Sequence, residues 1–126
     1  MPASYVIDKE RGLVISKGTG RYTADDGLAH QTALAADPNF QSTFNQLLDF
    51  TEVTQLVLNT DSIRMLATRH VFSEQSRRAF LVTNKLAIGL TNMFAAYREI
   101  AGGKEQMKIF EDREEAMQWL MGKPSC

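Results

Sequence analysis

The sequence predicts a single α/β domain, residues 1–126, built on one mixed, mainly parallel sheet of about five strands with about four helices. Three observations predict it. After two short β-rich runs, strand-length apolar segments alternate with helical patterns along the rest of the chain. The segment 79–82 is apolar throughout, which is typical of a strand covered on both faces. The chain has the size of one ordinary domain, and neither a repeat nor a linker divides it.

An opening antiparallel hairpin is expected from the β-rich runs at residues 5–7 and 13–16. Gly12 lies between them and can take the positive φ of a tight turn. The segment 18–23 lacks the third glycine and the lysine of a phosphate-binding loop. Its glycines are expected to permit a bend where strand gives way to helix.

The first helix is expected to begin after Thr23, whose hydroxyl suits an N-cap, and to end before Asp37-Pro38, since a residue preceding proline avoids the α region. A strand is predicted at residues 45–50. Residues 52–60 are expected to form a connection that carries some apolar residues of its own.

A second helix is expected to begin with Thr60 or Asp61 as its cap. It would bury Ile63, Leu66 and Ala67. Residues 69–76 are predicted as a loop, and residues 77–84 as the next strand.

The longest helix is expected from about Lys85 to the Gly102-Gly103 pair, because apolar residues recur there with the helical period. These residues are Leu86, Leu90, Met93, Phe94, Tyr97 and Ala101. A last strand is predicted at 106–112.

In the last helix, Asp112 and Glu115 have the spacing of a capping box, and Gly122 and Pro124 are expected to close it. Its apolar face would hold Ala116, Met117, Trp119 and Leu120.

The composition excludes several classes of function. With 14 basic and 15 acidic residues, the net charge is −1, which argues against nucleic acid as a main partner. The single cysteine, Cys126, can form neither an internal disulfide nor a metal cluster. Neither a signal peptide nor an apolar run of membrane-spanning length is present, so we expect a cytoplasmic domain without a membrane segment, metal or cofactor.

Six short segments in a fixed order carry a family resemblance. They lie at residues 20–23, 37–50, 60–67, 76–82, 89–94 and 109–120. In these segments the chain resembles the SpoIIAA-like family of small bacterial domains, which are related in fold to the STAS domains of anti-sigma-factor antagonists. The resemblance implies an α/β fold and a cytosolic setting but little chemistry, because a shared fold does not fix function.

Asp61-Ser62 is a candidate switch. The pair resembles the site at which anti-sigma-factor antagonists are phosphorylated, and a phosphate there would meet the positive end of a helix dipole. Ile63-Arg64 follows, where antagonists carry a small residue and glycine. The alternative is that these residues only start a helix.

Basic residues cluster after this site. Arg64, Arg69 and His70 would complete a partner-binding surface with Asp61 and Ser62. Together with Arg77 and Arg78, the basic residues could instead form an anion site, using the fork geometry of arginine. The alternative is a solvated loop whose two arginines lead into a strand.

A pocket for an apolar anionic ligand is a second candidate site. Arg77 and Arg78 would hold its head group, and residues of the long helix its apolar part. Asp49, at a strand end, would belong to the same site or only cap nearby backbone N–H groups. The helix residues could equally form a dimer face or ordinary core. They are Gly89, Met93, Phe94 and Tyr97.

These candidates support two functional hypotheses. The first is a non-catalytic interaction or regulatory module, homodimeric, with a regulatory protein as partner. The second is a small carrier for a lipid or other apolar anionic ligand. We do not expect an enzyme, because no motif pairs a nucleophile with a base or assembles a set of metal ligands.

Overall fold

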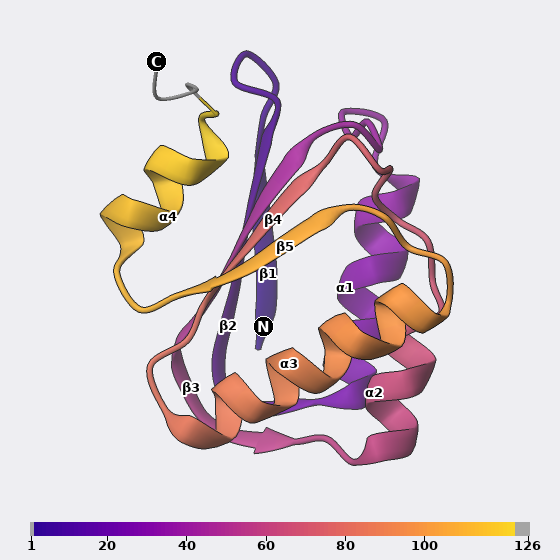
Figure 1. The fold of residues 1–126 in the computed structure, drawn as a ribbon, viewed down its shortest axis with the longest axis vertical. Helices are drawn as coiled ribbons and strands as arrows, with labels where there is room; N and C mark the ends of the chain where they lie inside the picture. The colour runs from indigo at the N-terminus through magenta and orange to yellow at the C-terminus, as the bar shows by residue number, and fades with distance from the viewer. Residues whose placement is uncertain (1, 123–126) are drawn as a thin grey trace.

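The structure is a computed structural model that describes residues 2–122, so the predictions for Pro124 and Cys126 fall outside the described residues. Strands and helices follow in the predicted order (Figure 1). They are β1 (Ala3–Asp8), β2 (Leu13–Thr23), α1 (Ala24–Ala36), β3 (Asn45–Val57), α2 (Thr60–Ala67), β4 (Arg77–Leu81), α3 (Lys85–Ile100), β5 (Gln106–Phe110) and α4 (Arg113–Leu120).

The sheet has five strands in sequence order, β1-β2-β3-β4-β5. The β1–β2 pair is antiparallel and the other three pairs are parallel, which confirms the predicted mixed sheet. Right-handed crossovers between strands in this order place α1, α2 and α3 on one face. Helix α4 follows the last strand and covers the opposite face (Figure 1).

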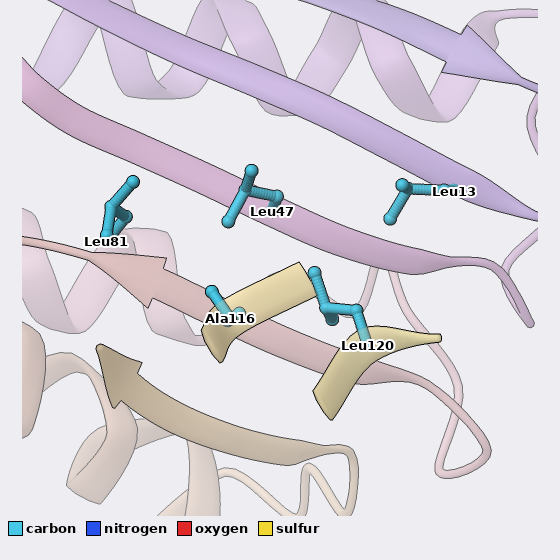
Figure 2. Packing of buried hydrophobic residues seen from close by; sticks show 6 residues of the cluster. Leu13, Leu47, Leu81, Ala116 and Leu120 are labelled. Atoms are coloured by element: carbon cyan, nitrogen blue, oxygen red, sulfur yellow. The ribbon is translucent and has the colours of Figure 1, made fainter. Parts of the chain in front are cut away.

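The face under α4 is filled by a close-packed apolar core. Its buried residues are Leu13, Leu47, Ala79, Leu81, Ala116 and Leu120, several of which are seen in Figure 2. They come from three neighbouring strands and from α4. Because side chains alternate across a strand, these strands turn their intervening residues toward α1, α2 and α3.

Strands β2 and β3 extend beyond the rest of the sheet, where the sequence predicted a bend and a connection. Residues Thr19–Thr23 pair with Glu52–Val57, with register shifts near Gly20. The prediction that 52–60 forms a connection was therefore wrong: the backbone groups of 52–57 are paired by the extension of β2. Gly18 permits this close approach, because a Cβ there would lie 2.9 Å from the side chains of Phe50 and Val53.

The helix caps agree with the predictions only in part. Thr23 caps α1 in a capping box with Asp26, and Asp112 caps α4 by accepting from the backbone N–H of Glu115 at 2.9 Å. The Glu115 side chain does not complete a box within the described residues. The cap of α2 is Asn59, not Thr60 or Asp61, since the Asn59 side chain accepts from the backbone N–H of Ser62 at 2.8 Å.

Candidate functional site

A cavity of about 80 Å³ lies between the sheet and the three crossover helices. Leu48 and Phe80 line it from the central strands, and Leu66 and Phe94 from α2 and α3. The extension of β3 contributes as well, through Phe50 and the residues that follow it. The remaining apolar lining comes from Leu34, Leu56, Leu58, Ile63, Val71, Phe72, Ala87 and Leu90.

Beside this cavity, a hydrogen-bonded chain of buried polar side chains runs across neighbouring strands on one face of the sheet. His30 Nε2 lies 2.8 Å from Ser16 Oγ, which accepts a hydrogen bond from Gln46 Nε2 at 3.0 Å. The oxygen of the same amide, Gln46 Oε1, accepts from Arg78 Nε at 2.9 Å. His30, Gln46 and Arg78 line the cavity, whereas Ser16 does not.

This chain of polar side chains continues into a network of ion pairs next to the start of β5. Glu105 accepts from Arg78 Nη1 at 2.9 Å and from Arg98 Nη2 at 2.7 Å. Arg98 Nη1 then donates to the carbonyls of Ala67 and Arg69 and lies 3.1 Å from His70 Nδ1. The network therefore links the cavity to the C-terminal end of α2.

Arg78 is the charged side chain in the cavity wall. The residue is 7% exposed, and its guanidinium lies 4.7, 5.6 and 5.5 Å from the ring centroids of Phe72, Phe80 and Phe94. Its Nε and Nη1 donate to Gln46 and Glu105, and within residues 2–122 its Nη2 has no hydrogen-bond partner. Cation–π contacts of this kind offset only part of the cost of burying a cation.

The network carries an excess positive charge. Two arginines, Arg78 and Arg98, share one carboxylate, Glu105. Burial lowers the pKa of Arg78 to about 10, although Glu105 opposes that shift. Burial alone would raise the pKa of Glu105, but the hydrogen bond from Arg98 and the charge of Arg78 outweigh it and lower that pKa. Burial, together with the charge of Arg78, lowers the pKa of His30 to about 4, so His30 is neutral at pH 7 and does not add to the charge.

Gln31 adds an unpaired acceptor to the cavity lining. Its Nε2 donates to the carbonyl of Leu66 at 3.1 Å, which fixes the orientation of the amide. Among the residues that the structure describes, Gln31 Oε1 is the fully buried side-chain oxygen or nitrogen without a hydrogen-bond partner. A ligand or water that donates a hydrogen bond would satisfy it.

The residues predicted for a ligand pocket are divided between the two faces of the sheet. Arg78 and Phe94 line the cavity. Arg77 lies on the α4 face, where Nη1 donates to the carbonyl of Trp119 at 2.8 Å, because successive side chains of a strand point to opposite faces. Asp49 lies on that face too, where it accepts from the backbone N–H of Thr51 at 2.9 Å.

The remaining predicted pocket residues lie on α3 away from the cavity lining. A Cβ on Gly89 would find nothing within 4 Å, so this glycine faces open space. Tyr97 pairs with Arg64 of α2, whose guanidinium lies 5.1 Å from the ring centroid. Met93 is half-buried on α3. These three residues therefore do not line this cavity with Arg78, and a role for them in binding a ligand stays a prediction.

The predicted switch and partner surface lies along α2. Asp61 is exposed, and Ser62 closes the capping box by accepting from the backbone N–H of Asn59 at 2.9 Å. Arg69 donates to Thr32 of α1, and His70 meets Arg98. These contacts favour the alternative that Asp61 and Ser62 start a helix, and they leave a partner-binding role as a prediction.

Sequence analysis missed most of the polar chain. Ser16, Gln46 and Arg78 fall on the helix-facing side of three adjacent strands, and the strand register that brings them together is not contained in a local sequence pattern. The alternative of a solvated loop at Arg77-Arg78 fails for Arg78, which is buried in β4. Arg98 and Glu105 gave no signal, since a single charged residue at the end of a helix or strand is ordinarily solvated.

Two kinds of feature are absent from residues 2–122. There the structure shows no helix long and apolar enough to span a membrane. The same part of the chain contains no group of three or more His, Cys, Asp or Glu side chains that could hold a metal ion.

The fold and the site together define a small α/β domain with a SpoIIAA-like fold. Among solved structures, an uncharacterised protein of the DUF3478 family from Shewanella loihica PV-4, described as having a SpoIIAA-like fold, is similar to this chain. The TM-score is 0.58 at 22% identity, over 94% of this chain and 93% of that one. The likeness confirms the predicted resemblance at the level of the fold. No protein-family model matches the chain, and no curated protein matches it either.

Proposed function

We propose that this protein is a non-catalytic binding domain for a small apolar ligand that carries one anionic head group. The observation that carries the proposal is Arg78, a buried cation in the wall of an otherwise largely apolar cavity. This is the second hypothesis from the sequence, with Arg78 retained as the head-group residue and Arg77 removed from that role.

The size of the cavity limits the apolar part of the ligand. An engineered cavity of about 150 Å³ holds benzene, so about 80 Å³ suits a short aliphatic chain. Burying each methylene of such a chain contributes about 0.8 kcal/mol. The Phe and Leu side chains of the lining provide the contacts for that burial.

The charge of the network favours an anionic head group. Arg78 and Arg98 share the single carboxylate of Glu105, so a ligand carboxylate would balance the remaining positive charge. Arg78 Nη2 is available for it, because Nε and Nη1 are already bonded. A charge-assisted hydrogen bond of this kind is about twice as strong as a neutral one.

The Ser16–His30 contact gives little support to catalysis. The 2.8 Å separation is that of a nucleophile and its base, but Ser16 does not line the cavity. Ser16 Oγ also accepts from Gln46, and the low pKa of His30 makes it a weak base at neutral pH. The pair is better explained as part of the buried polar chain.

Calorimetric titration with hexanoate tests the proposal. We expect binding with a Kd on the order of 0.1–1 mM, given the energy available per ligand atom. Hexanamide, which has the same chain length and no charge, should bind at least about tenfold more weakly. Binding of neither compound would overturn the proposal. Equal binding of both would contradict the role of the charge while leaving an apolar site.

Two variants on neighbouring residues locate the binding. Arg78→Met should lose hexanoate binding by about tenfold or more while the Arg98–Glu105 pair stays balanced. Arg77→Met, the matched control on the opposite face, should bind hexanoate as the wild type does. Ala87→Leu should weaken binding of both compounds, because Ala87 is buried and lines the cavity.

A regulatory role through the α2 surface is a second candidate function. The observation that favours it is the set of contacts from Arg98 to residues 67, 69 and 70, which joins that surface to the network beside the cavity. If a ligand draws Arg78 away from Glu105, the contacts of Arg98 should change as well. Hexanoate should then shift the backbone NMR signals of residues 67–70. Unchanged signals there at saturating hexanoate would contradict the link.

A further inference from the structure

We propose that two copies of this chain pair through the outward face of α3, with the two helices antiparallel. The face carries a repeat in which residues are spaced alternately by three and four positions, the spacing of a two-helix seam. Its members are Leu86, Gly89, Met93, Ala96 and Ile100.

This face is open in the single chain. Leu86 is 61% exposed and Ile100 is 79% exposed, and the Cβ position of Gly89 has nothing within 4 Å. The core-facing residues of α3 are Ala87, Thr91 and Arg98, on the other side of the helix. In Figure 1, α3 lies in front of the sheet with no other helix drawn over it. Leu86, one of the apolar residues that recur with the helical period, therefore faces away from the core.

Charges beside the seam indicate that the occupant is a second copy. Lys85, Asn92 and Glu99 are exposed, lie seven residues apart and form one flank of the face. In an antiparallel pair each flank meets the same flank of the other helix in reverse. Lys85 of each copy would then lie opposite Glu99 of the other copy. The ion pair would form twice, as a two-fold interface requires.

The helix dipole supports the antiparallel orientation. Lys85 occupies the first turn of α3 and Glu99 the last, so each lies at the end of the helix where its charge is disfavoured. Neither forms an ion pair within the described chain. An antiparallel partner would place its helix C-terminus beside Lys85 and its helix N-terminus beside Glu99. Pairing would therefore offset the unfavourable interaction of each charge with its own helix dipole. A parallel partner would not.

Sedimentation equilibrium of the full chain tests this interface. The mass of the wild type should rise from monomer toward dimer between about 10 µM and about 1 mM, as for a small interface. Lys85→Glu should weaken the dimer by about tenfold through two like-charge contacts, and Glu99→Lys should do the same. The double variant should restore it. An equimolar mixture of the two single variants should associate more tightly than either variant alone.

Two apolar substitutions test the seam itself. Ile100→Lys should abolish the dimer, whereas Val6→Lys, at another largely exposed position, on β1, should leave it unchanged. A wild type that stays monomeric up to about 1 mM would overturn the proposal. So would a dimer that tolerates Ile100→Lys. A mixture of the charge variants that associates no better than each alone would overturn the antiparallel arrangement. None of these positions lines the cavity, so the result is independent of ligand binding.

Discussion

Arg98 is held so closely that one added methyl group should displace it. The residue is 1% exposed, and a Cβ built on Gly103 would overlap its Nη2. Gly103→Ala should therefore loosen the pairing with Glu105 and lower the free energy of unfolding by about 2–4 kcal/mol. Gly89→Ala is the control, since it adds a methyl group in open space on a helix and should stabilise by about 0.5–1 kcal/mol. Denaturant unfolding of both variants checks this, and equal effects would contradict it.

His30 should make stability depend on pH. Its pKa is about 4 in the fold and about 6.5 in an unfolded chain. As the pH falls, His30 therefore takes up a proton in the unfolded chain before it does so in the folded chain. The free energy of unfolding is highest above pH 6.5 and decreases as the pH drops toward 4. The total loss should be on the order of 3 kcal/mol.

The chain offers a matched control for this pH dependence. Between pH 6.5 and 5, where carboxylates contribute least, His30→Gln should flatten the stability profile. His70→Gln, at the second and exposed histidine, is the matched control for the histidine-to-glutamine substitution itself. Thermal unfolding across this range measures both variants. If His30→Gln keeps the wild-type dependence of stability on pH, a group other than His30 takes up the proton.

Sequence analysis predicted the positions of single side chains least well. The two arginines at 77 and 78 were recognised as a possible anion site, but alternation across the strand sends them to opposite faces. Only the register of β4 against β3 shows which of them faces the helices. That register depends on tertiary packing, which a local pattern does not contain.

The start of α2 allows a test at the scale of an element. Ser62 accepts from the backbone N–H of Asn59, as Asp26 does from Thr23 at the start of α1. Ser62→Ala should cost about 0.5–1 kcal/mol, whereas Ser62→Asp should keep the box and stay within about 0.5 kcal/mol of the wild type. Denaturant unfolding measures both. If Ser62→Asp is the more destabilising, the acceptor role of Ser62 is contradicted.

Elements with a strong local signal were predicted well. Thr23 and the Asp37-Pro38 pair bounded α1, and the continuous apolar run of β4 was predicted as a strand. The extension of β2 and β3 was missed because residues 52–57 alternate only weakly, and their backbone partners lie more than thirty residues away. Non-local pairing therefore decided the strand extension from which Leu56 lines the cavity.

The ion network makes a prediction for the whole molecule, because it joins β3, β4, α3, the residue before β5 and the end of α2. Glu105→Gln would leave Arg78 and Arg98 buried without a counter-charge and should cost about 3–5 kcal/mol. Arg78→Met should cost less, since it leaves one balanced pair. Comparing the unfolding free energies of the two variants checks the order. A smaller cost for Glu105→Gln would contradict the excess positive charge.

The two faces of the sheet have different roles in the molecule. The α4 face holds an apolar core bordered by Asp49 and Arg77, while the opposite face combines a cavity with a buried polar chain. Fold class, strand order and most helix positions followed from the alternation of patterns along the chain. The cavity did not, because it depends on how three helices fail to fill the space above the sheet.

Mapping a ligand onto the folded chain tests the central claim most directly. Hexanoate would be titrated into isotope-labelled protein while the backbone and methyl NMR signals are followed. We expect saturating shifts at Leu48, Phe80 and Phe94, which line the cavity, and almost none at Leu81 and Ala116, which belong to the apolar core on the α4 face. Shifts that do not saturate, or that centre on the α4 face, would contradict a ligand site beside Arg78.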